Sequence, residues 1–180
     1  MSDAMDDFEA RYHDLAVVTC EWRAFDMSDP TVSARLVFAR LSKQKGGPNL
    51  KLFYKCVDAV IDQVYRDAAG KQSILNTLMV GATAMLQRPP KTPEERIRKA
   101  FVALSMRDVI LLRQGYWDNL TPEEMAEVNG GTADAQRQHL EAALKHFAAH
   151  LPTDAGDPVT AIRSIQPGEH RWRVEFDASA

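Results

Sequence analysis

The residues best suited to chemistry are six cations between Pro30 and Val57, a stretch that contains no aspartate or glutamate. Lysine and arginine side chains without counter-charges attract phosphate groups, so this stretch predicts contact with a nucleic-acid backbone. The six cations are Arg35, Arg40, Lys43, Lys45, Lys51 and Lys55. We name the stretch from Pro30 to Val57 the cationic region. Five of its six cations are predicted DNA-binding residues, and Arg35 has another predicted role.

Two aromatic residues, Phe53 and Tyr54, lie inside the cationic region. Aromatic rings among cations can stack on unpaired bases, so both are also predicted to bind DNA. The alternative is that Phe53 packs in a hydrophobic core while the lysines keep a helix surface soluble. The sequence leaves both interpretations open.

Motifs for catalysis are missing from the sequence. It contains no P-loop, no GxSxG, no HExxH and no paired-carboxylate motif, so we expect no enzymatic activity and no cofactor. His146 and His150 have the i, i+4 spacing of a metal-binding pair, and His139 falls on roughly the same helix face. No nearby cysteine or carboxylate obviously completes a site, which favours a surface face and no metal.

Composition indicates an ordinary globular chain of one or two domains. It is 45% hydrophobic and 26% charged, and its net charge of −3 produces no global positive field. Cys20 and Cys56 form no CxxC pair and are expected to be small buried residues in a reducing cytoplasm. The sequence predicts neither a signal peptide nor a membrane span.

The elements that must position the cations are predicted to be helices. Apolar spacing predicts helices over 6–25, 29–41 and 49–65, with a glycine-containing loop at 45–49. A strongly apolar stretch, Ile74 to Leu86, is expected to form a further helix that packs on a neighbour.

Two later helices are predicted to begin in the same way. Thr92-Pro93-Glu94-Glu95 and Thr121-Pro122-Glu123-Glu124 each place a capping threonine before a first-turn proline and two acids. After Leu151, residues up to Gln166 have few large apolar side chains and are interpreted as a tail. His170 to Phe176 alternates like a strand, which we expect to fold back on the helices or to remain disordered.

The segment from Leu120 to Phe147 is typical of a helix-turn-helix. A helix over 120–128 is followed by Gly130-Gly131 and a second helix over 133–147. The second helix of such a pair normally enters the DNA major groove, and its early residues read the bases. The predicted DNA-binding residues here are Gln136, Arg137 and Gln138. The charged residues of this helix cancel, so we expect it to grip DNA weakly.

This segment resembles the C-terminal promoter-recognition domain of bacterial extracytoplasmic-function sigma factors. That family reads Leu, Ser or Thr, any residue, Glu-Glu-Ile-Ala-Glu-Val, any residue and Gly, and residues 120–130 match without a gap. The N-terminal third resembles the family's first domain, through residues 8–15, 29–41 and 52–55. Both resemblances occur in the order and spacing of a two-domain sigma factor.

The resemblance implies an all-α fold with two small helical domains joined by an apolar linker. The expected parts are a sigma region 2-like domain at 6–69, a linker at 70–93, a sigma region 4-like helix-turn-helix domain at 94–151 and a tail at 152–180. In the family, one polar helix face docks on the RNA polymerase clamp. The residues here at or beside that face are Val32, Arg35 and Leu36, which are therefore the predicted polymerase-docking residues.

Three functions remain open. The first is a cytoplasmic, sigma-factor-like transcription regulator that acts with the RNA polymerase core at promoter DNA, with or without a co-activator protein. The second is a sigma-factor mimic that binds an anti-sigma factor or another regulator without binding promoters. The third is a helical protein-interaction module, because fold alone does not decide function.

Overall fold

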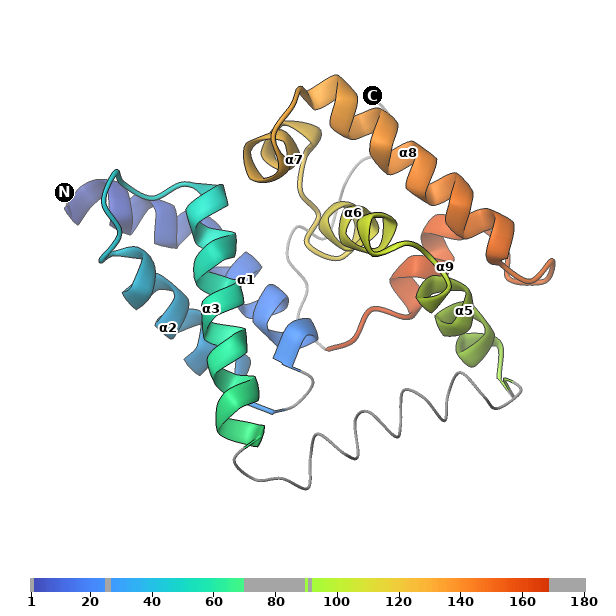
Figure 1. The fold of residues 1–180 in the computed structure, drawn as a ribbon, viewed down its shortest axis with the longest axis horizontal. Helices are drawn as coiled ribbons and strands as arrows, with labels where there is room; N and C mark the ends of the chain where they lie inside the picture. Colours follow the sequence, from blue (N-terminus) through green and yellow to red (C-terminus); the bar gives the residue numbers. More distant parts are fainter. Residues whose placement is uncertain (1, 25–26, 70–89, 91, 169–180) are drawn as a thin grey trace. The chain divides into compact units, whose positions relative to one another are not determined.

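The computed structural model describes residues 2–24, 27–69, 90 and 92–168. These residues form eight helices and no strand (Figure 1), which confirms the all-α class for the described part of the chain. The helices are α1 (Ser2–Ala24), α2 (Pro30–Leu41), α3 (Leu50–Ala69), α5 (Pro93–Val102), α6 (Met106–Tyr116), α7 (Pro122–Asn129), α8 (Ala133–His150) and α9 (Pro158–Ser164). The predicted helix over 74–86 and the predicted strand over 170–176 lie outside the described residues.

The described helices fall into two compact units. The first contains α1, α2 and α3, and the second contains α5, α6, α8 and α9 with the first part of α7. The domain limits expected from the sequence, including those of the linker, stay predictions. Among the described residues, no helix is both long and apolar enough to cross a membrane.

An aromatic cluster fills the core of the first unit. The Phe53 ring of α3 lies 6.1 Å from the Phe38 ring of α2 and 6.2 Å from the Phe8 ring of α1, measured between centroids. Val57 is fully buried one turn after Phe53. Large apolar side chains at helical spacing therefore join all three helices, because each helix buries one stripe against the other two. Cys20 and Cys56 form no disulfide with each other, and both are buried, as predicted.

The helix starts follow the local chemistry predicted from the sequence. The Thr92 hydroxyl accepts a hydrogen bond from the backbone N–H of Glu95, whose carboxylate accepts one from the N–H of Thr92. Thr121 and Glu124 make the same reciprocal pair at the start of α7. Each pair satisfies backbone donors that a helix cannot satisfy itself, so both predicted helix starts are confirmed.

A second aromatic cluster organises the other unit. The Phe101 ring lies 5.3 Å from the Trp117 ring, nearly parallel to it, and 5.9 Å from the Phe147 ring in an edge-on arrangement. Offset and edge-on arrangements are the favourable ones for aromatic pairs. The cluster therefore joins α5 and α8 to Trp117, the residue that caps the end of α6.

Helix α9 is a feature that the sequence analysis missed. The expected tail after Leu151 is wrong for Pro158–Ser164, which form a helix with Ala161 and Ile162 buried. The indole N–H of Trp117 donates a hydrogen bond to the Ile162 carbonyl at 3.1 Å, and Ile165 is also buried. A short helix with few large side chains docks here because it completes a core that other elements provide.

Candidate functional site

The cationic region comprises all of α2, the following loop and the first eight residues of α3. All six of its cations are exposed. The ion pairs found within the described residues are formed by other side chains. Six solvent-facing charges with no ion-pair partner among the described residues produce a local positive potential despite the net charge of −3.

Local hydrogen bonds and glycines place these cations. The Asp29 carboxylate caps α2 by accepting from the N–H groups of Thr31 at 2.8 Å and Val32 at 3.2 Å. After α2 the chain passes through Gly46 and Gly47, whose φ angles of +100° and +81° favour glycine. The side chain of Asn49 then accepts from the Leu52 N–H at 2.9 Å, which opens α3.

Phe53 and Tyr54 lie in the core and not on the surface. Phe53 is 0% exposed and Tyr54 is 5% exposed, and the two rings meet edge-on at 5.4 Å. The alternative of core packing is thus what the structure shows, and the assignment of these two rings to DNA binding is corrected. A buried ring has no free face on which a base can stack.

Arg40 lies close enough to Cys56 to influence its ionisation. Burial raises the pKa of the Cys56 thiol, while the guanidinium of Arg40 acts in the opposite direction. Burial has the larger effect, so the thiol remains neutral around neutral pH. Cys56 therefore supplies no anion to compensate Arg40, whose charge remains available to a partner.

The predicted polymerase-docking residues form an exposed strip on α2. Val32 and Leu36 are one turn apart and are 51% and 53% exposed, and Arg35 is also exposed. Large apolar side chains that are half open to solvent are typical of contact surfaces when they are grouped.

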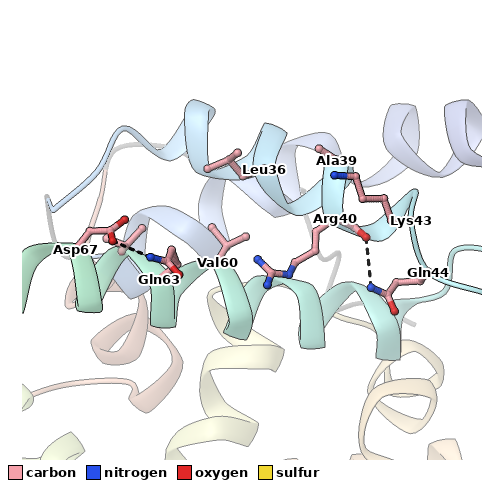
Figure 2. Close-up of a pocket in the computed structure, with 9 residues that line it drawn as sticks. Leu36, Ala39, Arg40, Lys43, Gln44, Val60, Gln63 and Asp67 are labelled. Atoms are coloured by element: carbon pink, nitrogen blue, oxygen red, sulfur yellow. Dashed lines mark hydrogen bonds between the residues drawn. The ribbon is translucent and has the colours of Figure 1, made fainter.

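A groove of about 520 Å³ lies beside this strip, between α2 and α3. Its apolar lining consists of Leu36, Ala39, Val60 and Val64. Figure 2 shows Arg40 and Lys43 toward one end and Asp67 at the other. Sequence reasoning missed this groove, although Val60 and Val64 have the spacing of one helix face.

The early residues of α8 are less available than the sequence suggests. Gln136 is buried at 5% exposure, which corrects its assignment as a base-reading residue. Arg137 is exposed but forms an ion pair with Asp134, one turn earlier, at 2.8 Å. Gln138 is exposed and stays a predicted DNA-binding residue. The structure therefore leaves Arg137 and Gln138 as candidates here, and the charge of the first is already compensated.

The histidines of α8 have partners of their own. His146 Nδ1 lies 3.0 Å from an Asp108 carboxylate oxygen, and the Arg107 guanidinium donates to His139 Nε2 at 3.1 Å. His150 Nδ1 lies 2.8 Å from the His146 carbonyl oxygen. Across the part of the chain that the structure describes, no group of three or more potential ligands surrounds a metal position. Comparisons with protein-family models, curated proteins and solved structures found no match.

Proposed function

We propose that this chain is a sigma-factor-like transcription regulator that acts with RNA polymerase at promoter DNA to initiate or activate transcription. One observation carries the proposal: the six cations of the cationic region are exposed and have no ion-pair partner among the described residues. Phosphates are the biological partners that best match an array of free cations. Val32 and Leu36, exposed apolar residues within the same region, are proposed to contact polymerase.

In this mechanism the two surfaces have different roles. The strip on α2 contacts the polymerase, and Lys45, Lys51 and Lys55 contact the DNA backbone. Phosphate contacts fix the position of the protein on the duplex without reading its sequence. Gln138 and Arg137 are the α8 residues with exposed side chains in the position to read base edges.

The first test is a pull-down of the tagged full chain from extract of its own cells, scored for RNA polymerase subunits. Recovery of the core subunits in near-stoichiometric amount supports the proposal. If polymerase is absent and one small protein is recovered instead, the chain is a sigma mimic and the proposal is wrong.

The second test measures DNA binding with matched variants. Lys51→Gln with Lys55→Gln is expected to lower the slope of log affinity against log salt by about 1.8, since each phosphate contact contributes about 0.9. Lys99→Gln with Arg163→Gln removes the same charge from exposed positions in the second unit and is expected to leave the slope unchanged. Equal effects of the two pairs would contradict the assignment of DNA contacts to the cationic region.

A second candidate function, the sigma mimic, is favoured by the helix-turn-helix. Gln136 is buried and Arg137 is paired with Asp134, so α8 offers DNA little free charge. A mimic needs the helices to bind a regulator and does not need phosphate contacts. Transcription that is unaffected by Lys51→Gln with Lys55→Gln, while partner binding persists, would favour this function over the first.

A further inference from the structure

The groove between α2 and α3 has an apolar floor with charge along its rim. Leu36 from α2 and Val60 and Val64 from α3 line it, and Leu36 is 53% exposed. Val32, also about half exposed, continues the apolar surface one turn earlier along α2. Side chains of this kind gain free energy when a partner removes them from water.

The charges on the rim are unequal along the groove. Arg40 and Lys43 stand near one end, and Asp67 stands at the other, where it accepts a hydrogen bond from Gln63 at 2.7 Å (Figure 2). No ion pair within the described residues compensates Arg40 or Lys43. A complementary partner therefore carries acidic groups opposite the two cations.

The dimensions of the surface suit a helix. From Val32 to Arg40, the surface extends about 12 Å along α2, at roughly 1.5 Å per residue, or a little over two helical turns, and Lys43 follows the end of the helix. An amphipathic helix that lies in such a groove places apolar residues on its floor at i, i+3, i+4 and i+7. Its flanking positions then meet the charges on the rim.

We infer that this groove binds an amphipathic helix of a partner protein, with the acidic residues of that helix opposite Arg40 and Lys43. The inference rests on the proposed function, because Val32 and Leu36 also belong to the strip proposed to contact polymerase, and it adds the groove and the chemistry of the partner element. The proposed DNA contacts Lys45, Lys51 and Lys55 do not line the groove. The inference specifies a partner protein whose helix carries acidic residues. Experiments can therefore contradict the proposed DNA contacts and the proposed protein contact independently.

The test uses two synthetic peptides of about five helical turns, each held helical by a side-chain lactam. Both carry the same leucine stripe, flanked by glutamates in one and by lysines in the other. Fluorescence anisotropy with the full chain measures both affinities. The acidic peptide is expected to bind at least about tenfold more tightly than the basic one.

Substitutions in the groove then locate the binding. Leu36→Asp is expected to weaken the acidic peptide by at least about tenfold, because it puts a charge on the apolar floor. Arg40→Glu with Lys43→Glu is expected to invert the preference, so that the basic peptide binds more tightly. Thermal unfolding of each variant checks that the fold is kept. We expect it to be kept, because Leu36, Arg40 and Lys43 are all exposed.

Two controls match these substitutions. Lys99→Glu with Arg163→Glu changes the net charge equally at exposed positions in the second unit, and Met106→Asp alters an apolar side chain that is 73% exposed in the same unit. Neither control is expected to change peptide affinity by more than about twofold. Equal effects of control and groove substitutions, or a basic peptide that binds as tightly as the acidic one, would overturn the inference. If Leu36→Asp abolishes binding of duplex DNA but not of the peptide, the groove belongs to nucleic acid and the inference is wrong.

Discussion

The cationic region and the predicted helix-turn-helix of α7 and α8 differ in how their charges are used. Lys51 and Lys55 are exposed and have no ion-pair partner within the described residues, whereas Arg137 in the early part of α8 is bound to Asp134. The segment with the architecture typical of DNA readers thus has little free charge, and the segment with the free charge is built from other helices. The comparison teaches that helix arrangement and phosphate affinity are separate properties.

The largest expected effect concerns the aromatic residue between those lysines. Phe53→Ala is expected to destabilise the first unit by about 3–5 kcal/mol, because it removes a fully buried ring from a packed core. Chemical denaturation of the full chain measures the change. Phe147→Ala, at a fully buried position in the second unit, is the matched control with a similar expected cost. If Phe53→Ala leaves stability intact and weakens DNA binding, the ring serves recognition instead.

A smaller effect is expected at the start of α7. Thr121→Ala removes the hydroxyl that accepts from the Glu124 N–H and should cost about 1 kcal/mol of stability. Denaturation followed by circular dichroism measures this cost. Thr121→Ser keeps the hydroxyl and is expected to restore most of the lost stability. DNA affinity should stay nearly unchanged in Thr121→Ala at a temperature where the variant remains folded. A strong loss of affinity would show that α7 contributes to DNA binding, and not the cationic region alone.

Removing the ion-pair partner of Arg137 should leave α8 with an uncompensated cation, as in the cationic region. Asp134→Asn removes the ion-pair partner and is expected to raise DNA affinity at low salt by at most about fivefold, in line with the small strength of exposed ion pairs. Anisotropy titrations at several salt concentrations measure the change. Glu141→Gln, which removes one acid from an exposed position later in α8, is the matched control for net charge. An equal gain in both variants would attribute the effect to net charge and not to Arg137.

The smallest effect is a pH dependence at α9. Hydrogen bonds from the backbone N–H and the hydroxyl of Thr160 hold the pKa of Asp157 below its ordinary value. A lowered folded-state pKa means that the carboxylate stabilises the fold above the unfolded value of about 3.9 and loses this contribution as pH falls through the folded value. Thermal unfolding between pH 5 and pH 2 should therefore show a smaller acid loss in Asp157→Asn than in the natural chain. An unchanged acid profile would contradict a role for this cap in acid stability.

Much of the fold was predictable because its signals are local. Apolar spacing predicted α2 and α3, and threonine-proline-glutamate patterns predicted the starts of α5 and α7, since capping bonds join residues three apart. Helix α9 was missed because Ile162 and Ile165 are too few to produce a periodic signal. The carbonyl of Ile162 accepts a hydrogen bond from Trp117, a residue 45 positions earlier that sequence spacing cannot connect to it.

The candidate site was predictable in charge but not in shape. A stretch without acids is visible in the sequence, and the structure shows its cations exposed. Which residues turn inward was harder to predict, as Phe53, Tyr54 and Gln136 show. The groove was not predictable either, because Leu36 and Val60 come together only through the packing of α2 against α3.

The alternation of Lys51, Phe53 and Lys55 affects how this chain can change over generations. The ring is buried and the two amines on either side of it are exposed, although all three residues lie close together on α3. Exchanges at the two exposed positions alter the attraction for anions in single steps while the core tolerates them, because surface substitutions seldom cost much stability. Successive substitutions at these exposed positions can therefore change the charge of the partner that the first unit binds, while every intermediate sequence still folds.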